Sequence, residues 1–522
     1  IALARSQGAD SVKLLIAAND GKNSSVAQQI QALGGTVEVS NENIDYVLAD
    51  VPTDKAESVF GISGVESLGL DEVLPLEDPR ADGIAAPTPQ TPPSASTPQI
   101  NPYIPIGDTG AAQFMQNNPG WDGRGVTVGI LDSGIDLAHP ALSTTTTGER
   151  KIIDWVTFTA QSTDNDPTWL NMSTQVTGPT FTVSGASYTA PAAAAYRFAL
   201  FNERDARLGG ELGNDVNRDG NPAGSSGVFA VLWDKASNTV WVDTNQNRNF
   251  TDDQAMTDYK VRYDIGTFGT DNPATAISES MPFVVQTSPS TNYVNIGIVS
   301  GAHGSHVAGI VAGNHLFGGA MTGAAPGAKL VSIRVCLFIS GCTSSALVNG
   351  MIFAVETAHV DTINMSIGGL PALNAGENNG PANTRAILYN RLVDEGVQIF
   401  ISAGNNGAGV NTIGDPSVAA KVMSLGSYVT DATWRSNYGS DSAYVDNIHN
   451  YSSRGPREDG GMKPQIVAPG AAVSTVPTWQ AGQPVAGVYD LPPGYGMFNG
   501  TSMASPQAAG AAALLISAAK QS

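Results

Sequence analysis

The chain has 522 residues and carries 26 Lys and Arg side chains against 47 Asp and Glu side chains, a net charge of −21. Because so acidic a chain repels polyanions, this balance argues against nucleic acid or an anionic membrane surface as its partner. No run of residues reaches the roughly 18 uncharged apolar positions that a membrane-spanning helix needs. Apolar residues make up 41% of the chain, which predicts a globular protein of several domains.

Residues 1–78 predict a small α+β domain. Strand-like runs cover residues 11–18, 36–39, 46–51 and 65–70. Helices are expected at 24–33 and after Thr53. The resulting order β-α-β-β-α-β is that of a split βαβ, or ferredoxin-like, module. Residues 79–106 are rich in Pro with Ser, Thr and Gln between, which predicts an extended linker without a core of its own.

Residues 107–522 predict an α/β domain with a mainly parallel sheet. Largely apolar runs indicate strands covered on both faces at 126–131, 329–335, 362–367 and 397–402. Helices are expected near 304–313, 344–358, 384–395 and 502–518. Residues at about 145–300 interrupt this alternation. They are rich in Ser, Thr and Asn with hairpin patterning, and we expect them to form a β-rich insertion.

Three polar residues of the α/β domain could serve nucleophilic chemistry together. Asp132 stands in Asp-Ser-Gly after a strand, His303 in His-Gly-Ser-His-Val-Ala-Gly at a helix start, and Ser502 in Gly-Thr-Ser-Met-Ala-Ser-Pro at another. Taken alone, each has an ordinary explanation as a turn, packing or N-cap residue. Together they are the hydroxyl nucleophile, imidazole base and orienting carboxylate that acyl transfer needs.

A fourth residue, Asn405, follows the run 397–402 in the motif Ser-Ala-Gly-Asn. Its side-chain amide could donate to a developing oxyanion, with the backbone N–H of Ser502 as a second donor, and one such donor is typically worth about 10²–10³ in rate. The alternative is a turn residue that tolerates left-handed geometry. Parallel sheets gather polar groups at the carboxyl ends of their strands, which predicts that these residues meet there.

In the order Asp132, His303, Asn405 and Ser502, these motifs resemble those of the subtilisin-type serine peptidases over roughly residues 120–518. The resemblance implies a subtilisin-like three-layer α/β fold. It implies a catalytic triad of Asp132, His303 and Ser502 with Asn405 as oxyanion donor, and it makes His306 a helix-packing residue. Residues 1–78 resemble the propeptide inhibitor domain of the same family.

The resemblance also implies exposed strand edges that bind an extended substrate. The expected substrate-binding residues are Ser366, Ile367 and Gly368, the facing Ala403 and Gly404, and Ser340 and Gly341 on a second edge. Within the family, the core resembles that of tripeptidyl-peptidase II, which is also interrupted between Asp and His. The acidic residues that anchor a free amino terminus there fall near Cys342 and Gly369, and neither position is acidic in this chain.

Two segments of the expected insertion have oxygen ligands at alternate positions, as calcium loops do. The residues concerned are Asp215, Asn217 and Asp219 in the first segment and Asp243, Asn245 and Asn247 in the second. Neither segment has a Glu at the twelfth position, and Arg248 stands where the second would need Gly. A structural calcium ion is one explanation, and turns rich in Asn and Asp are the other. No cofactor is expected for catalysis.

The two cysteines, Cys336 and Cys342, are six positions apart. They could be free thiols in one loop or a short-range disulfide, and a disulfide would favour an oxidising compartment.

The leading hypothesis is a secreted serine endopeptidase that hydrolyses polypeptides through an acyl-enzyme on Ser502. It would be made as a zymogen, with its own propeptide as intramolecular inhibitor until self-cleavage within about Leu74–Arg80. A second hypothesis is an aminopeptidase that releases tripeptides. A third is a non-catalytic binding module on a peptidase scaffold; loss of a triad residue would mark it, and none is lost.

Overall fold

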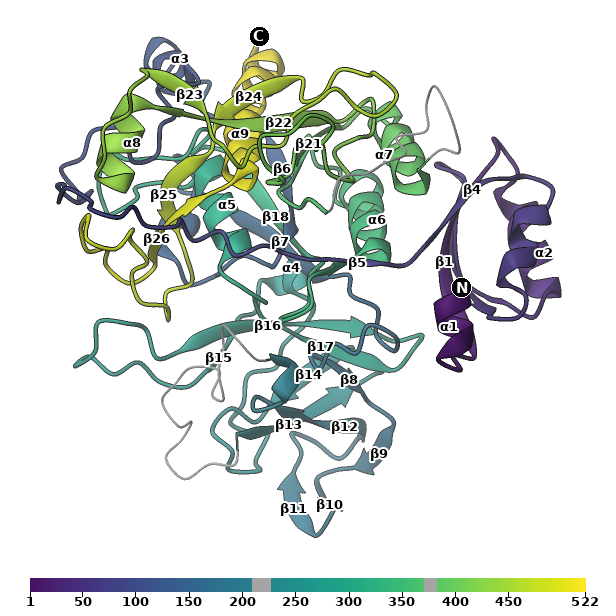
Figure 1. Ribbon diagram of the computed structural model, residues 1–522. Coiled ribbons are helices and arrows are strands. Elements are labelled where there is room, and N and C mark those ends of the chain that lie inside the picture. The colour runs from purple at the N-terminus through teal and green to yellow at the C-terminus, as the bar shows by residue number, and fades with distance from the viewer. Residues whose placement is uncertain (209–226, 370–382) are drawn as a thin grey trace.

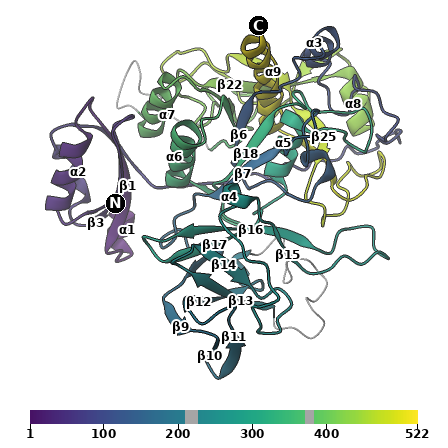
Figure 2. The same cartoon turned by 180° about the vertical axis from the view of Figure 1, so that it is seen from behind.

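The computed structural model describes residues 1–208, 227–369 and 383–522. A small N-terminal domain lies beside helices α6 and α7 of a larger α/β domain, and a β-rich segment projects from another side of that domain (Figure 1). The view from behind shows the same arrangement (Figure 2). None of the described helices combines the length and the apolar character that a bilayer crossing requires.

The N-terminal domain is a four-stranded antiparallel sheet in the order β2-β3-β1-β4, with helix α2 on one face. Its elements are α1 (Ala2–Ser6), β1 (Ser11–Ala18), α2 (Asn23–Ala32), β2 (Thr36–Asn41), β3 (Tyr46–Pro52) and β4 (Val65–Leu70). Leu14 and Ile16 of β1 pack against Val26 and Ile30 of α2. Residues two apart in a strand share one face of the sheet, and residues four apart in a helix share one face of the helix. The second expected helix is a short 3₁₀ helix, Ala56–Gly61.

The α/β domain is built on a sheet in the order β23-β22-β21-β20-β6-β18-β7, with β24 paired to β22. Its strands are β6 (Thr127–Asp132), β7 (Ile152–Thr157), β18 (Lys329–Arg334), β20 (Thr362–Met365), β21 (Gln398–Ser402), β22 (Met423–Thr430), β23 (Asp446–Ile448) and β24 (Ile466–Pro469). Every pairing is parallel except β22 with β23. The α/β fold expected from the sequence is confirmed.

Helices cover both faces of this sheet. They are α3 (Ala111–Asn117), α5 (His303–Ala312), α6 (Ser344–Ile352), α7 (Thr384–Asp394), α8 (Asp431–Tyr438) and α9 (Thr501–Gln521). Val128 and Ile130 of β6 share a core with α5 and α9, whereas the next residue, Leu131, shares a core with α6 and α7. The neighbouring side chains of one strand thus face different helix layers, which makes the three-layer arrangement. An antiparallel hairpin, β25 (Ala471–Thr475) and β26 (Tyr495–Asn499), completes the domain.

The β-rich segment contains two antiparallel sheets, β14-β13-β12-β9 and β15-β16-β17-β8, and the hairpin β10-β11. Its elements are β8 (Trp169–Asn171), β9 (Thr174–Thr177), β10 (Thr180–Val183), β11 (Ala186–Thr189), β12 (Ala195–Asn202), β13 (Val228–Asp234), β14 (Thr239–Val242), α4 (Tyr259–Arg262), β15 (Gly266–Phe268), β16 (Met281–Ser288) and β17 (Tyr293–Gly297). β7 falls inside the range 145–300 expected for the insertion, yet it pairs with β18 in the main sheet. The part outside that sheet therefore begins after Thr157.

Residues 71–80, which we call the strap, connect the N-terminal domain to the rest of the chain. Strand β5 (Val73–Leu74) of the strap pairs antiparallel with β19 (Cys342–Thr343) of the α/β domain. Farther along, the backbone N–H of Asn499 donates to the carbonyl oxygen of Pro79 at 2.9 Å. The strap therefore crosses the α/β domain from β19 to β26.

Candidate active site

Asp132 and His303 form a buried pair at the carboxyl end of the main sheet. Asp132 is the last residue of β6 and is fully buried, and His303 is the first residue of α5 and is 3% exposed. His303 Nδ1 lies 2.9 Å from each carboxylate oxygen of Asp132. An Nδ1–H that donates to the carboxylate fixes the tautomer of the ring and leaves Nε2 free to accept a proton.

Ser502 lies in the first turn of α9, directly after Gly500 and Thr501. The φ of Gly500 is +143°, a backbone conformation that favours glycine, and it brings the chain sharply into the helix. Ser502 Oγ donates to the carbonyl oxygen of Ser366 at 3.0 Å, and the Ser366 hydroxyl donates back to the carbonyl oxygen of Ser502 at 2.7 Å. In the described part of the chain, Ser502 Oγ therefore makes its hydrogen bond to Ser366 and not to the His303 ring.

Asn405 is oriented by the residue before Ser502. Its Oδ1 accepts hydrogen bonds from both the backbone N–H and the hydroxyl of Thr501, each at 2.9 Å. The amide nitrogen must therefore point the other way, where Nδ2 donates to Glu77 Oε2 of the strap at 2.8 Å. Thr501 and Glu77 are site residues that the sequence reasoning missed. Thr501 stands inside a quoted motif, but Glu77 has no local signal that predicts this contact.

The strap fills the space between these residues. Residues 75–79 line a common cavity with His303, Asn405 and Ser502, and its volume is about 20 Å³. That volume holds about one water molecule, so the strap leaves no room for a substrate beside Ser502 and Asn405. A larger cavity of about 640 Å³ remains between the strap, His303 and the loop that contains Gly341.

The strap lies between the two segments that the sequence predicts to bind substrate. A Cβ on Gly341 would stand 2.1 Å from the carbonyl oxygen of Leu74, and one on Gly369 would stand 2.9 Å from the Leu74 side chain. Ser366, Gly368 and Gly404 line the cavity at Ser502. Among the other expected residues, Ile367 and Ala403 have their side chains in hydrophobic cores, and Ser340 is exposed on the loop before Gly341.

His306, one turn after His303, packs inside the domain. Its Nε2 donates to the carbonyl oxygens of Ala472 and Gly496 at 3.1 and 3.0 Å, and its ring stacks on Phe498. Burial lowers the pKa of His306 to about 3, so this ring stays neutral at physiological pH.

The second expected calcium segment is a compact acidic loop. Asp243 is buried, and its Oδ1 has no hydrogen-bond partner. Burial, together with the charges of Asp243 and Asp252, raises the pKa of Asp253 to about 7. Asn247 Nδ2 donates to Asp252 Oδ2 at 2.8 Å. Asp252 and Asp253 were not predicted, although they stand at the tenth and eleventh loop positions.

These residues fit a calcium ion by the chemistry of their oxygens and by an orphaned buried carboxylate oxygen. Within residues 1–208, 227–369 and 383–522, no three His, Cys, Asp or Glu side chains are already gathered around a common metal position. The first expected segment, Asp215, Asn217 and Asp219, lies outside the described residues.

A parallel sheet that brings a buried Asp–His pair close to a helix-start serine defines a class of protein. The family model described as "Subtilase family" matches residues 123–522, and the chain belongs to this family. A second model, described as "Putative peptidase inhibitor domain", matches residues 2–69. The resemblance to subtilisin-type serine peptidases is thereby confirmed.

Individual relatives match over most of this chain. Pyrolysin from Pyrococcus furiosus is 29% identical over 98% of this chain and 39% of its own length. Tripeptidyl-peptidase 2 from Caenorhabditis elegans is 29% identical over 82% of this chain and 34% of its own length. The chain thus spans less than two fifths of the length of these two curated relatives.

Two solved structures show the same fold. The crystal structure of tripeptidyl peptidase 2 has a TM-score of 0.55 at 24% identity and covers 79% of this chain and 34% of that chain. Fervidolysin from Fervidobacterium pennivorans, a keratinolytic enzyme related to subtilisin, has a TM-score of 0.50 at 16% identity and covers 98% of this chain and 55% of that chain.

Proposed function

We propose that the chain is the core of a secreted serine endopeptidase that hydrolyses polypeptides through an acyl-enzyme on Ser502. One observation carries the proposal. The Asp132–His303 pair, at 2.9 Å, shares with Ser502 and Asn405 a site that a continuous peptide segment of the same chain occupies. Membership of the subtilase family supports the reaction class.

Hydrolysis of a separate substrate requires the strap to leave first, whereas in self-cleavage the strap is the substrate. Ser502 Oγ then turns from the Ser366 carbonyl toward His303 Nε2, which takes its proton as the hydroxyl attacks the substrate carbonyl carbon. The Asp132 carboxylate accepts the Nδ1–H bond and stabilises the imidazolium that forms. The new C–O bond leaves a negative oxygen, which accepts from Asn405 Nδ2 and the Ser502 backbone N–H.

The second step releases the products. His303 returns the proton to the leaving amine as the peptide C–N bond breaks, which gives the acyl-enzyme. A water molecule then attacks the ester carbonyl while His303 takes the water proton and delivers it to Ser502 Oγ. The atoms balance as one peptide bond and one water converted to a carboxylic acid and an amine.

The N-terminal domain and strap make this chain a zymogen in our proposal. Antiparallel pairing of Val73–Leu74 with β19 is the way an extended peptide adds to an exposed strand edge. The N-terminal domain is held to the α/β domain by contacts such as Arg391 with Glu66 at 2.6 Å, and the strap by contacts such as Ser345 Oγ with Asp71 at 2.6 Å. Self-cleavage within about Leu74–Arg80 would free the site.

Two observations favour an endopeptidase over a tripeptide-releasing aminopeptidase. The strap runs through the cleft as an unbroken chain, from β19 on one side of Ser502 to Asn499 on the other. Positions Cys342 and Gly369 carry no carboxylate to bind a free amino terminus. Four relatives named tripeptidyl-peptidase 2 support the exopeptidase as the alternative function.

The proposal also includes secretion of the protein and a structural calcium ion. Cys336 and Cys342 form a disulfide, which is typical of oxidising compartments. A structural calcium ion would be held by Asp243, Asn245 and Asn247 together with Asp252 and Asp253, and it would supply charge that offsets the repulsion among these carboxylates.

The test uses the full chain and a Ser502→Ala variant. We expect mass spectrometry to show cleavage within residues 74–80 of the wild-type chain only. We also expect a fluorophosphonate to label the matured wild type at Ser502, and both N-blocked and free-amine forms of one peptide to be hydrolysed. Failure to label would leave only a binding module, and rejection of the blocked peptide would establish the aminopeptidase. Equal processing of the Ser502→Ala chain would refute self-cleavage.

A further inference from the structure

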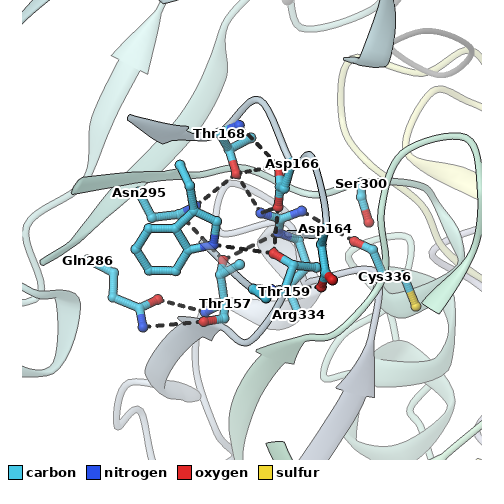
Figure 3. Close-up of polar contacts among 12 residues, drawn as sticks. Thr157, Thr159, Asp164, Asp166, Thr168, Gln286, Asn295, Ser300, Arg334 and Cys336 are labelled. Carbon is cyan, nitrogen blue, oxygen red and sulfur yellow. Dashed lines mark hydrogen bonds and ion pairs between the residues drawn. The ribbon is translucent and has the colours of Figure 1, made fainter. Parts of the chain in front are cut away.

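A buried polar cluster joins the β-rich segment to the main sheet (Figure 3). Its centre is Arg334, the last residue of β18, whose side chain is fully buried. The Arg334 guanidinium donates to Asp166 Oδ2 at 2.8 Å and to Thr168 Oγ1 at 2.7 Å. Arg334 lies opposite Asp132 in the register of β18 and β6, so this cluster borders the catalytic end of the sheet.

The cluster is fully hydrogen-bonded on the Asp166 side. Asp166 also accepts from the Thr159 hydroxyl at 2.6 Å and from the Thr168 hydroxyl at 2.8 Å. Burial alone would raise the pKa of Asp166, but Arg334 and these donors hold that pKa below its usual range, so the carboxylate stays charged. A buried charged network whose members are all satisfied holds one geometry, because any displacement leaves a charge unpaired.

The same cluster extends to the β-rich segment through Asn295 of β17. Asn295 Nδ2 donates to Thr168 Oγ1 at 2.8 Å, and Thr157 Oγ1 at the end of β7 donates to Asn295 Oδ1 at 3.0 Å. β17 and β7 are thereby fixed against residues 158–168, the loop that leads from β7 to β8, which we call the base loop. The base loop cannot shift without breaking these bonds.

Two contacts connect this rigid cluster to β19, the strand that pairs with the strap. Arg334 Nη1 donates to the carbonyl oxygen of Cys336 at 3.2 Å, at the start of the loop closed by the disulfide. At the far end of that loop, Thr343 Oγ1 donates to Asp164 Oδ2 at 3.0 Å, and Asp164 Oδ2 is itself fixed by the backbone N–H of Ala160 at 2.7 Å. The base loop and its partner Arg334 therefore hold both ends of residues 336–343.

β19 needs such support because it consists of only two residues, Cys342 and Thr343. A strand of two residues makes too few hydrogen bonds to hold its position without contacts from neighbouring segments. It nevertheless pairs with Val73 and Leu74, and Leu74 precedes Glu77, the strap residue at the oxyanion donor, by three positions. β19 thus meets the part of a bound chain that lies well upstream of the reacting bond.

We propose that the base loop positions β19 for the upstream residues of extended substrates, with Asp164 and the Arg334–Asp166 pair as positioning residues. The proposal rests on the peptidase function proposed above and adds to it a basis for preferring long over short substrates. Among the described residues, Asp164 and Asp166 make no hydrogen bond to Asp132 or His303, so we expect their effect to pass through β19.

The test compares two substrates that share the residue before the scissile bond: an N-blocked four-residue chromogenic peptide and an N-blocked single-residue ester. In matured Asp164→Ala enzyme, we expect kcat/KM for the peptide to fall about tenfold, the scale of one lost hydrogen bond to a charged acceptor, through a higher KM. The ester should change less than about twofold, because it does not reach β19.

Asp234→Ala is the matched control. Asp234 also accepts from a backbone N–H and a hydroxyl, those of Ala236 and Ser237, but it does so in the hairpin of the β-rich segment far along the chain from β19. Both substrates should be cleaved by this variant as by wild type.

A second variant, Arg334→Met with Asp166→Leu, removes both buried charges together and avoids leaving one unpaired. We expect the same loss on the peptide and the same insensitivity of the ester. Equal losses on both substrates, or no loss on either, would overturn the positioning role while the peptidase function stood. A wild type that cleaves neither substrate would instead refute the proposed function.

Discussion

The carboxylate of Glu77 binds the side-chain amide of Asn405, which in the proposed mechanism donates to the oxyanion. Its Oε2 accepts from Asn405 Nδ2 at 2.8 Å, a charge-assisted bond. A tetrahedral intermediate formed on the strap would need that donor for itself. Glu77 therefore opposes the self-cleavage of the segment that carries it.

Glu77→Ala should accelerate maturation, because Asn405 becomes free to stabilise the oxyanion. We expect the half-time of strap cleavage to shorten at least about fivefold, a part of the 1.5–3 kcal/mol that a hydrogen bond to a charged group contributes. Timed electrophoresis of the refolded full chain measures it. Asp78→Ala is the control, since Asp78 bonds to Arg80 inside the strap; equal acceleration by both variants would show general loosening.

Asn405→Ala should lower kcat of the matured enzyme by about 10²–10³ with little change in KM, because the lost donor acts on the transition state. Steady-state kinetics on one peptide measures both constants. Asn406→Ala serves as control: within the described residues, the Asn406 side chain donates a hydrogen bond to the Gly369 carbonyl at 3.4 Å and makes none to the catalytic pair. A loss in kcat for Asn406→Ala as large as that for Asn405→Ala would contradict the assigned oxyanion role.

For individual residues, the sequence could predict which polar side chains gather at the carboxyl edge of the sheet. Asp132, His303 and Ser502 each stand at the end of a strand or the start of a helix, and a parallel sheet brings such positions together. Glu77 could not be found in this way. It lies in an irregular segment, and its partner Asn405 is 328 positions away, so only the path of the folded strap brings them into contact.

The loop between β14 and α4 gathers three acidic side chains, Asp243, Asp252 and Asp253. Asp243, Asp252 and Asp253 repel one another, and buried carboxylate oxygens of Asp243 and Asp253 have no hydrogen-bond partner. Such oxygens cost stability unless a cation or a donor satisfies them. The proposed calcium ion would supply that charge.

Calcium should therefore raise the thermal stability of chelator-treated protein. In Ser502→Ala protein, which cannot digest itself, we expect calcium at about one hundred times its Kd to add about 2.7 kcal/mol and to raise Tm by several degrees. Asp243→Asn should reduce this gain, whereas Asp234→Asn in the neighbouring hairpin should keep it. Calorimetric unfolding with and without calcium measures this rise in Tm. An undiminished rise in Asp243→Asn would place the ion elsewhere.

The elements also show where pattern reading fails. The apolar runs behind β6, β18, β20 and β21 are buried on both faces, which is why they were recognisable. β7 has the mixed sequence Ile-Ile-Asp-Trp-Val-Thr because it is the last strand of the sheet, next to the β-rich segment. Without a continuous apolar run, its sequence predicts part of the insertion and not a strand of the main sheet.

Across the whole molecule, the N-terminal domain is joined to the α/β domain by both apolar and polar contacts. Leu15 and Leu48, on one face of its sheet, share a core with Leu388 of α7. Arg391 of α7 bonds to the carbonyl oxygens of Ile44 and Ala18. These pairs are more than 300 positions apart, so the sequence predicted two domains but could not predict how they dock.

The molecule as a whole should be sensitive to acid because several of its six histidines are buried. Burial lowers the pKa of His139 to about 4 and those of His306 and His449 to about 3. Unfolded histidine has a pKa near 6.5, so below that pH the unfolded chain binds protons that the native protein does not. Stability is therefore fully present above about pH 6.5 and is lost as the pH falls toward 4 and 3.

His449→Phe should weaken this pH dependence. His449 stacks on Tyr451 with ring centroids 4.6 Å apart, an arrangement that Phe can keep, but Phe cannot take up a proton. One buried histidine contributes a slope of up to about 1.4 kcal/mol per pH unit between pH 6.5 and its native pKa. In the Ser502→Ala background, the loss of Tm between pH 7 and pH 5 should be smaller for His449→Phe than for the parent. His315→Phe, at an exposed position, should leave that loss unchanged, and an identical loss in all three proteins would mean that His449 is not buried in its neutral form.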